Sequence, residues 1–174
     1  MKRMRLFVVA GLFVFGVSPV FAQDTCEIER RVDENTGITT LSTSSAFRFD
    51  FLREHVGAFG EGDVSMVLAY QPGMLQLGIY VVSLEKAFLD GNGEMLTRVD
   101  GDDGPRLQAI GSQTHEEDGV YMEVLAFNLT EDQFRQLASA EQVRFRLPAF
   151  ERFERELMPV HLNCLKSFLA EMEK

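Results

Sequence analysis

The residue types that could form a catalytic or zinc site are few in this sequence and lie far apart. The three histidines, His55, His115 and His161, show none of the i, i+4 spacings of helical zinc sites. Ser83-Leu-Glu-Lys86 matches the S-x-x-K pattern, in which a lysine helps to activate a serine nucleophile. However, the chain contains neither a later Lys-Thr-Gly nor a G-x-S-x-G segment. We therefore interpret Ser83–Lys86 as a chance match at the end of a strand.

Carboxylates are abundant and suggest two further kinds of site. Asp90, Asn92 and Glu94 occupy positions 1, 3 and 5 of a calcium-loop pattern. Met95 replaces the glycine that such a loop needs for its sharp turn, and Gly101 replaces the bidentate glutamate. We therefore expect solvated turns, with no metal and no cofactor.

Paired carboxylates about 5–9.5 Å apart could also act as acid and base in a hydrolase. Glu123 is the central candidate, with Glu94 or Asp100 as its partner if neighbouring strands bring them together.

Two arginines have a spacing typical of a ligand clamp. Arg144 and Arg146 alternate with the apolar residues Val143, Phe145 and Leu147. Alternate residues of a strand face opposite sides, so both arginines should point away from the core. One interpretation is cross-strand pairing with acids on a neighbouring strand. The other is a two-arginine clamp for a carboxylate- or phosphate-bearing partner, because guanidinium groups bind such anions bidentately.

The N-terminus predicts export. Residues 1–22 contain a basic start, an apolar run and a small residue, Ala22, at a cleavage position. The mature domain would then span residues 23–174. In an oxidising compartment the only two cysteines, Cys26 and Cys164, are expected to form a disulfide that joins the two ends of the mature chain.

The charge of the mature chain excludes several partners. Residues 1–22 contain three basic residues and no acids, so removing them leaves 14 basic and 27 acidic residues, a formal charge of −13. Nucleic-acid binding needs clustered Lys and Arg, so it is not expected. Stable membrane insertion after signal cleavage is not expected either, and an unknown protein or a small anionic ligand is the expected partner.

The middle of the chain predicts antiparallel hairpins. The first joins residues 64–70 and 74–83 across Gln71-Pro72-Gly73, and the second joins 106–114 and 120–129 across 115–119. Residues 94–99 form a further strand, which ends in a turn at 100–105. Nearer the N-terminus, residues 33–37 predict a turn between two extended runs, and residues 39–45 predict a loop. Residues 47–51 alternate as a strand, although a short helix reaching His55 is an alternative.

Two helices follow from local signals. Thr130 and Gln133 form a capping-box pattern, and Leu129 and Phe134 are placed as a hydrophobic staple. Pro159 suits the first turn of a last, amphipathic helix. Together these elements predict an α+β fold, with an antiparallel β-sheet or β-sandwich, a short helix and a C-terminal amphipathic helix.

Two segments resemble a group of uncharacterised exported bacterial proteins. They are the Asp33-x-x-Thr36-Gly37 turn and Leu137-Ala-Ser-Ala140-x-x-Val143-x-x-Arg146. The resemblance covers both ends of the mature chain. It implies export and a sheet-plus-helix fold, and it implies no activity.

These observations predict a non-catalytic binding or interaction module of the bacterial periplasm or exterior. Two alternatives stay open. One is an inhibitor or immunity protein whose acidic surface masks a cationic enzyme. The other is a small carboxylate-dependent hydrolase.

Overall fold

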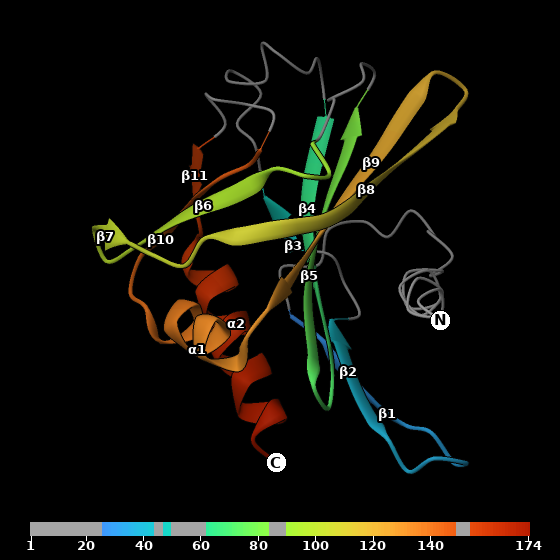
Figure 1. Cartoon of the computed structure of the whole chain (residues 1–174), viewed down its shortest axis with the longest axis vertical. Helices are drawn as coiled ribbons and strands as arrows, with labels where there is room; N and C mark the ends of the chain where they lie inside the picture. The colour runs from blue at the N-terminus through green and yellow to red at the C-terminus, as the bar shows by residue number, and fades with distance from the viewer. Residues whose placement is uncertain (1–25, 44–46, 50–61, 84–89, 149–153) are drawn as a thin grey trace, which may run out of the picture.

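One antiparallel sheet forms most of the described protein, and two helices lie beside it (Figure 1). The computed structural model describes residues 26–43, 47–49, 62–83, 90–148 and 154–174. The predicted signal segment, His55 and Lys86 lie outside these residues. Within them, the predicted α+β fold is confirmed.

The described elements are eleven strands and two helices. The strands are β1 (Ile28–Val32), β2 (Thr39–Thr43), β3 (Phe47–Phe49), β4 (Gly62–Gln71), β5 (Met74–Ser83), β6 (Glu94–Val99), β7 (Asp102–Asp103), β8 (Leu107–Glu117), β9 (Val120–Leu129), β10 (Val143–Arg146) and β11 (Glu154–Glu156). The helices are α1 (Glu131–Ser139) and α2 (Pro159–Met172).

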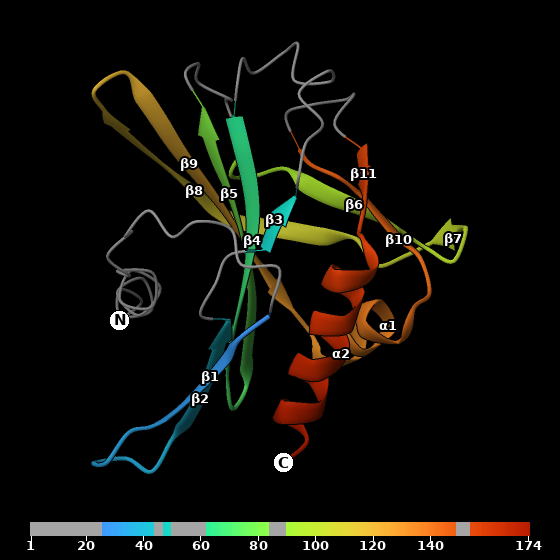
Figure 2. The ribbon, with the colours of Figure 1, turned by 180° about the vertical axis from the view of Figure 1, so that it is seen from behind.

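The strand order along the sheet is β1-β2-β4-β5-β9-β8-β6-β10-β11, with β3 beside β4 and β7 beside β6. The long strands β4, β5 and β9 form its centre, and β6 and β10 run across their direction (Figures 1 and 2). The 64–70/74–83 hairpin is confirmed, with Gln71 paired to Met74 across the Pro72-Gly73 turn. Gly73 has a φ of 81°, a conformation that glycine adopts without a Cβ clash.

The hydrophobic core lies between the sheet and the two helices. On β9 the residues with odd numbers from Glu123 to Leu129 are buried, as the two-residue period of a strand requires. Phe134 of α1 meets Phe168 of α2 edge to face, with ring centroids 5.8 Å apart. Both rings are fully buried, so this pair joins the two helices to each other inside the core.

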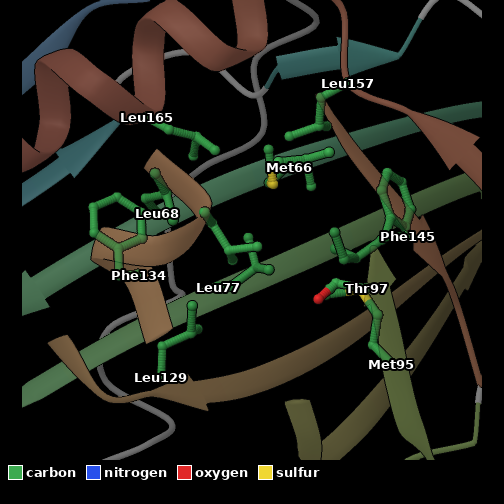
Figure 3. A pocket seen from close by; sticks show the side chains of 13 residues that line it. Met66, Leu68, Leu77, Met95, Thr97, Leu129, Phe134, Phe145, Leu157 and Leu165 are labelled. Carbon is green, nitrogen blue, oxygen red and sulfur yellow. The ribbon is translucent and has the colours of Figure 1, made fainter. Parts of the chain in front are cut away.

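A small apolar cavity remains in this core (Figure 3). It measures about 30 Å³, and its walls come from β4, β5, β6, β9, β10, Leu157 and both helices. The one polar side chain in its wall is Thr97, whose hydroxyl donates to the carbonyl oxygen of Pro105 at 2.6 Å. Ligand pockets measure roughly 300–1,000 Å³. We therefore treat this cavity as a packing gap and not as a binding site.

The predicted start of α1 is confirmed. The Thr130 hydroxyl accepts from the backbone N–H of Gln133 at 3.1 Å, and the Gln133 side chain accepts from the backbone N–H of Thr130 at 2.9 Å. The last helix begins at Pro159, as predicted. Its buried His161 side chain accepts from the backbone N–H of Met158 through Nδ1 at 3.0 Å, so the imidazole caps this helix.

The predicted disulfide between Cys26 and Cys164 is present. The two residues are 138 positions apart in sequence, and Cys164 is buried in the core face of α2. The bridge therefore holds the segment that leads into β1 against the last helix.

The resemblance motif near the N-terminus forms the turn between β1 and β2. The Asp33 carboxylate accepts from the backbone N–H groups of Asn35 and Thr36 at 2.8 and 2.9 Å. These hydrogen bonds hold the pKa of Asp33 below its usual range. The Thr36 hydroxyl accepts from the backbone N–H of Ile38 at 3.3 Å, and Gly37 takes a φ of 69°, so the three named residues of the motif shape this turn.

Two expectations about loops are wrong. Residues 39–43 form strand β2, where the β-branched threonines suit a strand and Thr43 accepts from the backbone N–H of Leu68 at 3.1 Å. Residues 115–117 continue β8, because the turn occupies only Asp118 and Gly119. Both have positive φ, 52° and 78°, as a two-residue type I′ hairpin turn requires.

The remaining differences between the predicted and observed elements concern short strands. β7 interrupts the predicted turn at residues 100–105 by pairing with β6. β11, which sequence did not predict, pairs with β10. In the 47–51 segment, β3 is a strand over residues 47–49, and the rest lies outside the described residues.

Candidate functional site

The exposed side of β10 carries the two arginines that the sequence singled out. Val143 and Phe145 are buried, whereas Arg144 and Arg146 are exposed. Val143 and Phe145 face the core on one side of the strand. Both guanidinium groups therefore project from the other side, as the alternation predicted.

The register of the sheet adds a third arginine. Arg144 lies directly opposite Arg98 of β6 on one side and opposite Glu156 of β11 on the other. Arg98 in turn lies opposite Asp103 of β7. The result is a row of four charged side chains across four strands, with the two arginines in the middle and an acid at each end.

The two end pairs differ in geometry. Arg144 Nε donates to Glu156 Oε2 at 3.0 Å, while Arg98 Nε lies 4.0 Å from Asp103 Oδ1. A hydrogen bond from the Gln142 side chain and the bond from Arg144 hold the pKa of Glu156 below its ordinary value. The cross-strand pairing considered from sequence therefore exists for Arg144, whereas the ion pair between Arg98 and Asp103 is a long one, at 4.0 Å.

Arg98, Arg144 and Arg146 together form what we call the arginine surface. The side chains of Arg98 and Arg144 are 59% and 48% exposed. Directly opposite residues have Cβ atoms about 4.5–5.5 Å apart, and like charges at that spacing destabilise a sheet. Within the described part of the chain, the Arg146 side chain makes no hydrogen bond or ion pair, although it lies opposite Glu154. Three acids, Asp103, Glu156 and Glu154, lie opposite the three arginines, so the formal charges balance, but only Arg144 makes a close hydrogen bond with its acid.

Asp100 sets the register that brings Arg98 and Arg144 together. It follows β6 directly and has a φ of 52°. Its Oδ1 accepts from the backbone N–H groups of Glu141 and Gln142, at 2.9 and 2.8 Å. This carboxylate, considered from sequence as a hydrolase group, instead holds the segment that leads into β10.

The other acids proposed for a hydrolase lie apart. Glu123 is buried on β9 opposite Thr114 of β8, while Glu94 is opposite Gln108 of the same strand. Six residues of strand at about 3.3 Å each separate these positions by roughly 20 Å. Glu94 is exposed and lies 3.3 Å from Arg106. The structure therefore does not bring Glu94 to Glu123.

The calcium-like turn, Asp90 to Glu94, is held by a hydrogen bond within the turn. Asp90 Oδ1 accepts from the backbone N–H of Asn92 at 2.9 Å, as in an ordinary Asx turn. His115 is exposed, 3.9 Å from Glu117, and His161 serves the α2 cap. In the ranges that the structure describes, no group of three or more His, Cys, Asp or Glu side chains could hold a metal ion.

Sequence reasoning missed Arg98. Alternation on β6 could have shown that this side chain faces outward, because Thr97 and Val99 are buried. Its position opposite Arg144 depends on the pairing of β6 with β10, which no local signal reports.

Comparisons with known proteins found no relative of this chain. No family model matches the chain, and no curated protein or solved structure is significantly similar to it. None of the helices in the described ranges has the length and apolar character needed to cross a membrane.

Proposed function

We propose that this protein is an exported, non-catalytic binding module that holds an anionic group of its partner on the arginine surface. The observation that carries the proposal is the position of Arg98 directly opposite Arg144, with Arg146 two residues further along β10. The partner would be a protein or a small ligand that presents a carboxylate or a phosphate.

The chemistry of arginine favours this class of partner. A guanidinium group stays charged at any physiological pH and offers five donors in a planar fork. Arg144 uses Nε for Glu156, which leaves its terminal nitrogens on the exposed side. An anion placed between Arg98 and Arg144 would replace their mutual repulsion by two attractions, and the bidentate geometry would give it a defined orientation.

The proposed location is the periplasm or the exterior of a bacterium. The basic and apolar character of residues 1–22 supports a signal peptide, and the Cys26–Cys164 bridge is compatible with an oxidising compartment. The excess of acids on the mature chain favours a partner that reaches the arginine surface through a localised anion, because a broadly anionic partner would be repelled elsewhere.

The two alternatives have less support. A hydrolase based on Glu123 and Glu94 would need them within about 5–9.5 Å, and the sheet separates them. An inhibitor of a cationic enzyme would use acidic surface elsewhere, such as the end of the β8–β9 hairpin.

The test uses the mature protein with inorganic phosphate and citrate as probes. At constant ionic strength, both anions should raise the melting temperature more than chloride does. The Arg98→Gln/Arg144→Gln double variant should lose this difference. The control is Arg106→Gln, which removes an exposed arginine directly before β8. This variant should keep the full difference in melting temperature between the anions and chloride. If the double variant keeps the same melting-temperature difference, the arginine surface is not the anion-binding site.

A further inference from the structure

Among the described residues, the outer edge of β8 has no strand partner over most of its length. β8 pairs with β9 from Ala109 to Glu117, but β6 covers its other edge only at Leu107 and Gln108. A β-bulge at Ile110 and the Asp118-Gly119 turn bound the remaining part. The backbone of Gly91 lies against Gly111 and Ser112, so this part of the edge is covered. We call Gln113–Glu117 the free edge of β8, because no described strand pairs with it on that side.

The free edge lies beyond the 90–93 turn, which contacts β8 only as far as Ser112 among the described residues. The β8–β9 hairpin extends beyond the body of the sheet in both views (Figures 1 and 2). Every residue from Ser112 to Val120 is exposed. Along an edge, backbone N–H and C=O groups point outward at alternate residues and are available to another chain. The edge is therefore accessible to a strand from a partner.

The side chains of the edge restrict which strand would fit. Gln113 and Thr114 are uncharged and polar, His115 lies 3.9 Å from Glu117, and Glu116 and Glu117 are adjacent acids. Adjacent residues of a strand face opposite sides of the sheet, so one carboxylate lies on each face. A partner strand would need a basic residue on each face at the same level, which two consecutive Lys or Arg residues provide.

Strand direction places the basic pair within the partner. All described pairs in this sheet are antiparallel, and antiparallel pairing is slightly more stable than parallel pairing per residue. β8 runs from Leu107 towards Glu117, so an antiparallel partner starts beside Glu117 and ends beside Gln113. The two basic residues therefore belong at the beginning of the added strand.

We propose that the free edge of β8 binds an extended segment of another protein that begins with two adjacent basic residues and adds to the sheet as an antiparallel strand. Main-chain hydrogen bonds would supply affinity, and Glu116 and Glu117 would select the partner. The arginine surface takes no part in this interaction, so the inference does not rest on the anion-binding proposal.

The test is fluorescence anisotropy with a labelled synthetic peptide as long as the free edge. The peptide starts Lys-Arg and continues with alternating Thr and Val. It should bind the mature protein, and the Glu116→Lys/Glu117→Lys variant should bind it about tenfold more weakly, since two cross-strand attractions become repulsions. The same variant should gain affinity for a peptide that starts Glu-Glu. The control Glu34→Lys/Glu141→Lys changes net charge equally at exposed acids elsewhere and should behave like wild type.

Two measurements separate strand addition from charge attraction alone. N-methylation of alternate peptide amides should abolish binding, because it removes main-chain donors and keeps the charges. Hydrogen exchange should show protection of amides in Gln113–Glu117 on addition of the unmodified peptide. Equal binding of the N-methylated peptide, or unchanged binding by the charge-reversed variant, would overturn the inference. Dimerisation through this edge in the absence of peptide, measured by light scattering, would assign the edge to a second copy instead.

Discussion

Asp100 and Gln142 are joined by two hydrogen bonds that run in opposite directions. The backbone N–H of Asp100 donates to the carbonyl oxygen of Gln142 at 2.9 Å, and the backbone N–H of Gln142 donates to Oδ1 of Asp100 at 2.8 Å. This double link joins the end of β6 to the start of β10, 42 residues later. It fixes Arg98 opposite Arg144, so the arginine surface depends on a residue that is not part of it.

Replacing Asp100 by Ala should destabilise the protein by about 1–3 kcal/mol. The variant loses an acceptor for two backbone donors and places a Cβ-bearing residue without a local hydrogen bond at positive φ. Urea unfolding would measure the change. Asp100→Asn is the control, because asparagine retains Oδ1 and tolerates the left-handed conformation, so it should lose much less. Equal losses in both variants would contradict the role given to Oδ1.

Removing the disulfide should cost about 2–5 kcal/mol of unfolding free energy, as for native bridges in small secreted domains. The change is Cys26→Ser/Cys164→Ser, measured by chemical denaturation of the oxidised parent and the variant. Peptide mapping without a reductant should show the two cysteines linked in the parent. Two freely alkylated cysteines in the folded parent would contradict the bridge.

Thr130→Ala should destabilise α1 by about 0.5–2 kcal/mol, since the N–H of Gln133 loses its side-chain acceptor. Thermal unfolding would measure the effect. Thr130→Ser keeps the hydroxyl and should stay near wild type. An unaltered melting temperature for the alanine variant would mean that the capping box adds no stability.

Glu156 should give the protein a stabilising contribution that disappears in acid. The pKa of its carboxyl is lowered from the ordinary value of 4.5, first by the Gln142 side chain and then by Arg144. A group whose pKa is lower when folded stabilises the fold above its unfolded pKa. That contribution is lost as the pH falls below 4.5 and through the folded pKa.

Gln142→Ala and Arg144→Ala should each raise the pKa of Glu156, as measured by NMR titration of the carboxyl group. Their destabilisation relative to wild type should be present at pH 7 and shrink once Glu156 is protonated. Arg146→Ala is the control, because Arg146 has no contact with that carboxylate in the described residues. A pKa of Glu156 that does not respond to either partner would contradict the assigned causes.

Local signals predicted the elements whose ends are set by nearby residues. The Thr130–Gln133 capping box located α1, and the Pro72-Gly73 turn located the β4–β5 hairpin, because each signal acts within a few residues. The exposed side of β10 followed from simple alternation.

Elements that depend on distant partners were harder to predict. β2 was expected to be a loop, because its polar threonines become a strand only through pairing with β1 and β4. β11 is three residues long and owes its conformation to β10. Arg98 was missed for the same reason: its neighbour in space is decided by Asp100 and the segment around Gln142, which its own neighbours in sequence do not reveal.

The disulfide between Cys26 and Cys164 can form only after most of the chain has been synthesised. A ribosome adds about 5–20 residues per second, so the second cysteine is made roughly 7–28 s after the first, given their separation of 138 positions. During that interval Cys26 has no partner within its own chain. Once Cys164 emerges, two cysteines allow a single intramolecular pairing, so no shuffling between wrong partners is needed. The remaining error is a covalent link between two molecules, which a high local concentration in an oxidising compartment would promote.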